Sequence, residues 1–97
     1  MKTFKKHLNR YLQDPKFREM YNEEKELIEL SLRLQEARRK AGIPQERIAA
    51  QARLTQQQLS KIEGGENCNI KTYLRASHAM GFRLTLKPIR RSLSHAN

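Results

Sequence analysis

The chain has 97 residues, which is enough for one small domain and an arm but not for two hydrophobic cores. It carries 20 Lys and Arg against 10 Asp and Glu, and this net charge of +10 favours a polyanionic partner, most often nucleic acid. No run approaches the roughly 20 apolar residues of a membrane span and the start has no secretory pattern, so we expect a cytoplasmic protein without membrane contact.

Residues 1–30 are predicted to form an N-terminal helical extension. Thr3 is expected to cap a short helix, and Asp14 with the proline after it predicts the start of a second helix that runs to Ala41. Asn22 is a further cap candidate, and a break of the helix near Asn22 is the alternative. The extension carries seven basic and six acidic side chains, a balance typical of a solvated amphipathic helix.

Residues 31–81 are predicted to form a helix-turn-helix domain. Pro44 opens one short helix and Thr55 caps the next, with a turn of about three residues between them. Small residues on the first helix, Ala49 and Ala52, allow the two helices to cross closely. The second helix is then the one expected to enter the major groove of DNA.

The outward face of this second helix has the chemistry of a DNA reader. A glutamine amide can both donate to and accept from an adenine edge, and a lysine donates to guanine or to phosphate. Arg53 in the turn is expected to reach a phosphate. Asn67 and Asn69 after the helix are further phosphate candidates, with capping of the following helix as their primary role. The residues themselves therefore predict a DNA-binding set of Arg53, Thr55, Gln56, Gln57, Gln58, Ser60, Lys61 and Asn67.

The C-terminal part changes its apolar period. A last helix is predicted to end at Gly81, with Ile70, Leu74, Ser77 and Met80 or their neighbours inside. Beyond it, alternation with period two predicts a strand over residues 82–88. A lone strand leaves its backbone unpaired, so we expect it to pair with a second copy across a two-fold axis; the alternative is an extended tail packed on the domain. The dimerisation residues would be Phe82, Leu84 and Leu86, and residues 89–97 are predicted to be a disordered basic tail.

Signals of other chemistry are missing from the sequence. A single cysteine, Cys68, provides neither an internal disulfide nor a cysteine zinc site. No glycine-rich phosphate loop, nucleophile elbow or close carboxylate pair with a base is present. We therefore expect no enzyme activity, no catalytic residue, no metal and no cofactor.

The segment from Glu36 to Gly81 resembles the Cro/phage-repressor, or xenobiotic-response-element, type of helix-turn-helix domain. The motifs that carry the resemblance are Gly42-Ile43-Pro44-Gln45, Ile48-Ala49, Leu54-Thr55-Gln56, Leu59-Ser60-Lys61-Ile62-Glu63 and the second glycine of Gly64-Gly65. The resemblance implies that Gln45 contacts a phosphate, that Gln56, Gln57 and Lys61 read bases, and that Glu63 forms a structural salt bridge with Arg38. Two positions depart from the pattern: Pro44 stands where the family has a Ser or Thr cap, and Arg53 where it has glycine.

Both flanks resemble HigA-type antitoxins, through Phe4-Lys5-Lys6-His7-Leu8, Leu12-Gln13-Asp14-Pro15-Lys16-Phe17 and Tyr21 at the front and Gly81-Phe82-Arg83-Leu84-Thr85-Leu86 at the end. This resemblance implies an antitoxin of a type II toxin-antitoxin pair. It would neutralise a RelE/HigB-like mRNA-cleaving toxin and repress its own operon. The candidate toxin-binding residues are Phe4, Leu8, Tyr11, Phe17 and Tyr21, for which packing within the chain is the alternative.

The sequence thus predicts an all-α fold: a helical bundle with a repressor-like helix-turn-helix, an N-terminal helical extension and one C-terminal strand that pairs across a dimer. The homodimer would bind an inverted repeat in double-stranded operator DNA. Two other functions remain open, a stand-alone prophage-type transcriptional repressor without a toxin and an adaptor that no longer binds DNA.

Overall fold

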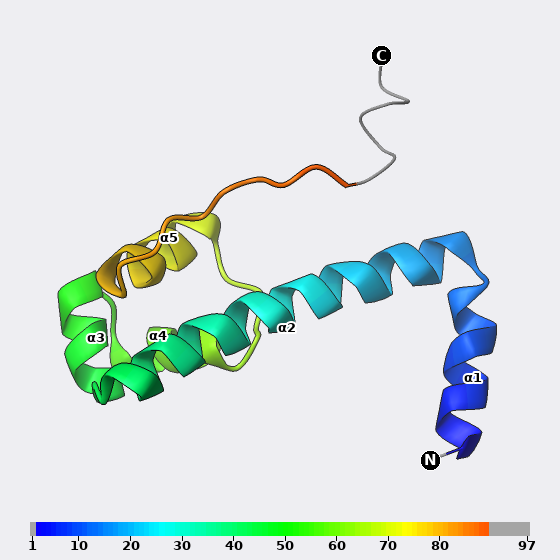
Figure 1. Cartoon of the computed structure of the whole chain (residues 1–97), viewed down its shortest axis with the longest axis horizontal. Coiled ribbons are helices and arrows are strands. Elements are labelled where there is room, and N and C mark those ends of the chain that lie inside the picture. Colours follow the sequence, from blue (N-terminus) through cyan, green and yellow to red (C-terminus); the bar gives the residue numbers. More distant parts are fainter. Residues whose placement is uncertain (1, 90–97) are drawn as a thin grey trace.

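The computed structural model describes residues 2–89, with the side chains of residues 2–5 left aside (Figure 1). Five helices follow one another: α1 (Lys2–Leu12), α2 (Pro15–Ala41), α3 (Gln45–Ala52), α4 (Gln56–Glu63) and α5 (Ile70–Ala79). No strand occurs within residues 2–89. The helical, repressor-like class is confirmed, and the predicted disordered tail lies beyond residue 89, almost wholly outside the described residues.

The start of α2 follows directly from its sequence. The Lys16 backbone N–H donates to Asp14 Oδ1 at 2.9 Å, and Pro15 occupies the first turn, where its missing N–H has no intrahelical acceptor to lose. The continuous helix predicted up to Ala41 is confirmed, and the break left open at Asn22 does not occur, because asparagine lowers helix propensity by no more than about 0.7 kcal/mol against alanine. The predicted cap at Thr3 is wrong, since α1 already includes Lys2.

The core lies between the C-terminal half of α2 and the three shorter helices. Its buried apolar members are Leu34, Ile48, Ala49, Ala52, Leu54, Leu59, Ile62, Tyr73 and Ala76. The N-terminal half of α2 projects away from this core, and α1 joins its far end at a steep angle (Figure 1). The boundary predicted between residues 30 and 31 therefore falls inside one continuous helix.

The loop between α4 and α5 packs tightly on α2. Gly65 has a φ of +78°, and a Cβ at this position would lie 3.2 Å from Ile28 Cγ1. Glycine is the residue that accepts both the positive φ and the close approach. Farther along, the Tyr73 hydroxyl donates to the Glu66 carbonyl at 2.7 Å, which ties the same loop to α5.

The inward face of α5 follows the sequence prediction except at its first position. Ser77 is buried as predicted, and so are Tyr73 and Ala76, which neighbour the predicted positions; the exception is Ile70 at the first position, which is 67% exposed. The helix begins only at Ile70, after its cap at Asn69, so its first side chain extends past the edge of the core.

After α5 the chain leaves the domain. The Phe82 N–H donates to the Ser77 carbonyl at 2.8 Å, and Leu84 packs against the core. Leu86 is fully exposed. The predicted strand at residues 82–88 is not formed within this chain; these residues are irregular and have no neighbouring strand to pair with. Within residues 2–89, no helix has the length and apolarity to cross a membrane.

Candidate nucleic-acid interface

The turn between α3 and α4 is made by an arginine in a conformation that favours glycine. Arg53 has φ 58° and ψ 43°, the left-handed region. In that conformation the Leu54 N–H reaches back to the Ala49 carbonyl at 2.9 Å and closes the end of α3. Leu54 then enters the core and the chain turns into α4. For a residue with a Cβ, this backbone conformation costs about 1–2 kcal/mol.

The start of α4 is held by a reciprocal cap. Thr55 Oγ1 accepts from the Gln58 backbone N–H at 3.0 Å, and Gln58 Oε1 accepts from the Thr55 backbone N–H at 2.8 Å. Such a capping box satisfies two backbone donors at once. Both residues were predicted as DNA contacts. In the structure their side-chain oxygens accept backbone N–H groups at the start of α4 and so fix the direction of the helix.

Four other side chains form the exposed reading face of α4: Gln56, Gln57, Ser60 and Lys61. None of them bonds to another described side chain, so their donors and acceptors remain available. The opposite face is anchored by Leu59 and Ile62, both 0% exposed. The helix therefore presents a rigid polar strip of amide, hydroxyl and ammonium groups, which is the inventory needed at base edges and phosphates.

A buried carboxylate joins the three helices behind this strip. Arg38 on α2 donates to Glu63 at the end of α4 through Nε at 2.7 Å and Nη2 at 2.9 Å. Gln45, the first residue of α3, donates through Nε2 to Glu63 Oε1 at 3.0 Å. Arg38 Nη1 also donates to the Ile43 carbonyl at 2.9 Å. The relative placement of α3 and α4 is thus set by one hydrogen-bonded cluster.

The electrostatics of this cluster favour the charged forms. Burial raises the pKa of Glu63, but the hydrogen bonds from Arg38 and Gln45 and the charges of Arg38 and Arg39 outweigh it, leaving that pKa below 4.5. The hydrogen bond to Glu63 raises the pKa of Arg38, against a smaller effect of burial. The pair is therefore ionised at neutral pH.

Comparison with known families now decides the class of the protein. Residues 34–86, more than half of the chain, match the family model described as helix-turn-helix. The chain belongs to the helix-turn-helix family, of the Cro/C1 type. It is accordingly a sequence-specific DNA-binding regulator. No curated protein matches the chain.

Within the helix-turn-helix domain, Gln45 is bonded to a neighbouring helix, whereas Asn67 is not. Gln45 is half-buried and donates one amide hydrogen to Glu63, so a phosphate contact would use its remaining amide hydrogen. Asn67 is exposed and the cap of α5 is Asn69, whose Oδ1 accepts from the Thr72 N–H at 3.0 Å. Asn67 therefore remains available to a partner.

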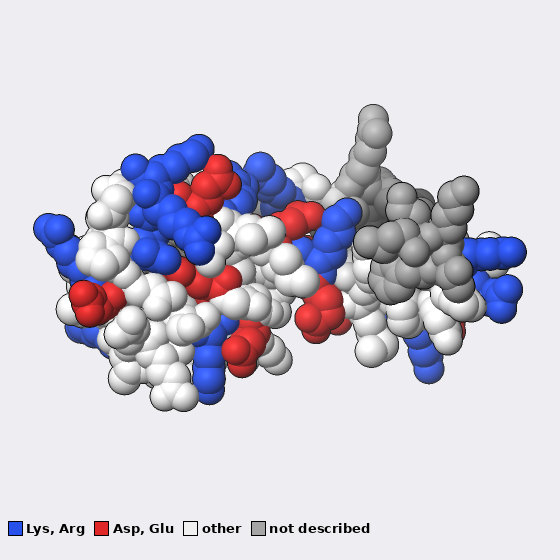
Figure 2. Space-filling model, turned by 90° about the horizontal axis from the view of Figure 1, so that it is seen from below, with Lys and Arg blue, Asp and Glu red and all other residues white. Residues whose placement is uncertain are grey.

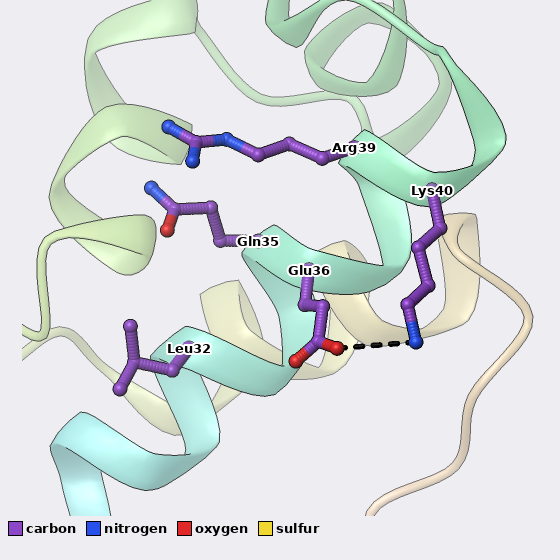
Figure 3. Close-up of a pocket in the computed structure, with 5 residues that line it drawn as sticks. All are labelled: Leu32, Gln35, Glu36, Arg39 and Lys40. Carbon is purple, nitrogen blue, oxygen red and sulfur yellow. Dashed lines mark ion pairs between the residues drawn. The ribbon is translucent and has the colours of Figure 1, made fainter.

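The structure also adds side chains from α2 to the edge of the helix-turn-helix. A shallow hollow of about 470 Å³ is lined by Leu32, Gln35, Glu36, Arg39 and Lys40. Figure 3 shows Gln35 and Arg39 extending from α2 toward the neighbouring helix, while Glu36 pairs with Lys40 at 3.1 Å on the other side. Arg39 thus brings a cation beside the reading helix. Its place next to Arg38 in the basic last turn of α2 was the one available sequence signal.

The surplus of positive charge lies in the domain rather than in the arm, where basic and acidic side chains nearly balance. Residues 31–81 carry nine Lys and Arg against four Asp and Glu. Figure 2 shows Lys and Arg clustered over the domain at the left, with fewer acidic side chains between them. This surplus provides the sequence-independent attraction to phosphate that DNA-binding domains need.

Proposed function

We propose that the protein is the antitoxin of a type II toxin-antitoxin pair. It neutralises a RelE/HigB-like mRNA-cleaving toxin, represses its own operon and acts in the cytoplasm. The observation that carries the proposal is the arm made of α1 and the N-terminal half of α2, which stands off the DNA-binding domain (Figure 1). A regulator that only bound DNA would have no use for a projecting arm with exposed apolar side chains.

Charge supports this use of the arm. Residues 15–30 carry five glutamates against three basic side chains, in a protein whose formal net charge is +10. A nuclease that acts on mRNA has a basic surface, because it must bind a polyanion. The acidic stretch is therefore complementary to the proposed partner, whereas the basic domain is complementary to DNA.

The apolar side chains of the arm divide into two groups. Leu8 and Phe17 are half-buried where α1 packs on α2, and the Tyr11 and Phe17 rings lie 5.1 Å apart. Tyr11, Met20 and Tyr21 remain 57%, 62% and 37% exposed. The exposed group supplies anchors for a partner, while Leu8 and Phe17 hold α1 against α2. The Phe4 side chain lies outside the described part of the chain.

The proposal includes a homodimer that pairs residues 82–88 as strands. From Arg83 to Ile89 the described residues make no backbone–backbone hydrogen bond, and Phe82 and Leu86 are 50% and 100% exposed. An extended segment with unpaired backbone groups and outward apolar side chains is suited to pair with its symmetry copy. The dimer would place two copies of α4 on an inverted-repeat operator.

A stand-alone repressor is the second candidate. The observation that favours it is the Tyr11–Phe17 contact, because part of the arm already satisfies its apolar surface within the chain. In that case the arm would stabilise the long α2 and bind no toxin.

Co-purification separates the two functions. The tagged full chain is expressed together with the products of its upstream and downstream neighbouring genes. We expect a small basic protein, which arrests growth when expressed alone, to co-purify in a fixed ratio. The double variant Met20→Ala, Tyr21→Ala should lose it, whereas Ile70→Ala, which removes a similarly exposed side chain on α5, should retain it. Promoter binding without any such partner would leave the repressor and refute the antitoxin.

A further inference from the structure

A second hollow lies between the end of α3 and the C-terminal half of α5. It measures about 230 Å³ and is lined by Gln51, Ala52, Arg53, Arg75, His78 and Ala79. Three of these six residues are basic and none is acidic among the residues described. The hollow thus brings together two guanidinium groups and an imidazole without a carboxylate.

One donor of a residue that lines the hollow has no partner. Arg75 Nε is almost completely inaccessible to solvent and makes no hydrogen bond to any described residue. A buried guanidinium N–H without an acceptor is unfavourable, because its hydration is lost and not replaced. Among its neighbours in the hollow, Arg53 carries donors only, and neither His78 nor Gln51 accepts a hydrogen bond from it.

The backbone at Arg53 points in the same direction. This arginine occupies the left-handed conformation, for which glycine is the unstrained residue. Its side chain lines the hollow and is exposed. A ligand in the hollow would explain why an arginine occupies this strained position, because its guanidinium would bind that ligand.

We propose that this hollow, formed by Arg53, Arg75 and His78, is a binding site for a single phosphate group. Phosphate offers several strong acceptor oxygens, and guanidinium groups match their geometry in pairs of hydrogen bonds. The volume is below the range of roughly 300–1,000 Å³ typical of sites that enclose a drug-sized ligand, but it admits one phosphate group. The phosphate comes either from the backbone of bound DNA or from a free phosphate ester. The site does not depend on the antitoxin function.

The test follows the arginine Nε–H signals of the full chain in ¹H–¹⁵N spectra without DNA. Inorganic phosphate is added against chloride at equal ionic strength, and the Arg75 signal is assigned by its loss in Arg75→Lys. We expect this signal to move with a saturable dependence on phosphate and not on chloride. Arg53→Gly should raise the apparent Kd for phosphate about tenfold, the loss of one charge-assisted contact. Glycine relieves the strained turn, so this variant keeps the fold. Arg33→Gln removes an exposed charge on α2 and should leave the Kd unchanged.

Three results would overturn the site. The Arg75 signal stays still, all arginine signals move alike, or acetate binds as tightly as phosphate. The source of the phosphate is then read from binding to operator DNA. If Arg53→Gly lowers the slope of log affinity against log salt by about one, the ligand is the DNA backbone. If the slope is unchanged while the native chain binds inorganic phosphate, the ligand is a free phosphate ester.

Discussion

Arg38 on α2 holds both carboxylate oxygens of Glu63 at the end of α4, with donor–acceptor distances of 2.7 and 2.9 Å. The side chains are only 12% and 2% exposed. Because Gln45 at the start of α3 shares the same carboxylate, this pair connects the helix that presents side chains to DNA with the two that support it. Its geometry leads to the first prediction.

Glu63→Ala should lower the free energy of unfolding by about 3 kcal/mol, because it leaves the Arg38 guanidinium largely buried without its counter-charge. Urea unfolding followed by circular dichroism measures this change. The matched control is Glu36→Ala, which breaks the exposed pair with Lys40 and should change stability by less than about 0.5 kcal/mol. Equal effects of the two variants would show that the buried pair does not organise the domain.

Stability should also fall with acid through the same carboxylate. The folded pKa of Glu63 lies below its ordinary value of 4.5. The stabilisation it provides is therefore complete above that value and is lost as the pH falls through the folded pKa. Urea unfolding between pH 7 and pH 3 should show this loss in the native chain and a weaker acid dependence in Glu63→Gln. Parallel curves for the two proteins would contradict the assignment to Glu63.

Neighbouring glutamines of α4 should separate binding from stability. Gln57→Ala should weaken operator binding by about 1–3 kcal/mol per half-site and leave unfolding unchanged, because the side chain is exposed and unbonded. Gln58→Ala should instead lower the free energy of unfolding by about 1 kcal/mol, through loss of half of the capping box. Fluorescence anisotropy with operator DNA and urea unfolding test the pair, and an unchanged operator affinity would remove Gln57 from the reading face.

Arg53→Gly should raise the free energy of unfolding by about 1 kcal/mol. Glycine removes the strain of a positive φ, and its larger chain entropy in the unfolded state offsets only part of this gain. Arg53→Ala is the control, since it removes the guanidinium but keeps the strain. Thermal unfolding distinguishes them: stabilisation by both variants would trace the effect to the side chain and not to the backbone.

Leu86→Lys should dissociate the proposed dimer while leaving the monomer folded. Leu86 is fully exposed, so its replacement disturbs no contact within the chain. Leu84 is less suitable, because it packs against the core and its loss would confuse folding with assembly. Sedimentation equilibrium measures the association, with Thr85→Lys as the control on the opposite face of an extended segment. A Leu86→Lys protein that remains dimeric would place the interface elsewhere.

The features that the sequence determined by itself are local ones. Asp14-Pro15 marks the start of α2, Thr55 with Gln58 starts α4, and the apolar spacing of Leu59 and Ile62 sets its buried face. Each depends on residues within one or two helical turns, where propensity and capping act directly. The density of these signals in residues 36–81 is also why the helix-turn-helix could be recognised without a structure.

Only the tertiary structure decided how distant residues share donors and space. Gln45, which is predicted to contact a phosphate, also donates to Glu63, 18 positions away, because the end of α4 is brought to the start of α3. Arg53 and Arg75 line one hollow, and Ile28 meets Gly65, for the same reason. Such contacts depend on the angles at which helices pack, which local spacing does not encode. The strand predicted at residues 82–88 is not formed within the described residues, and its proposed pairing would require a second chain.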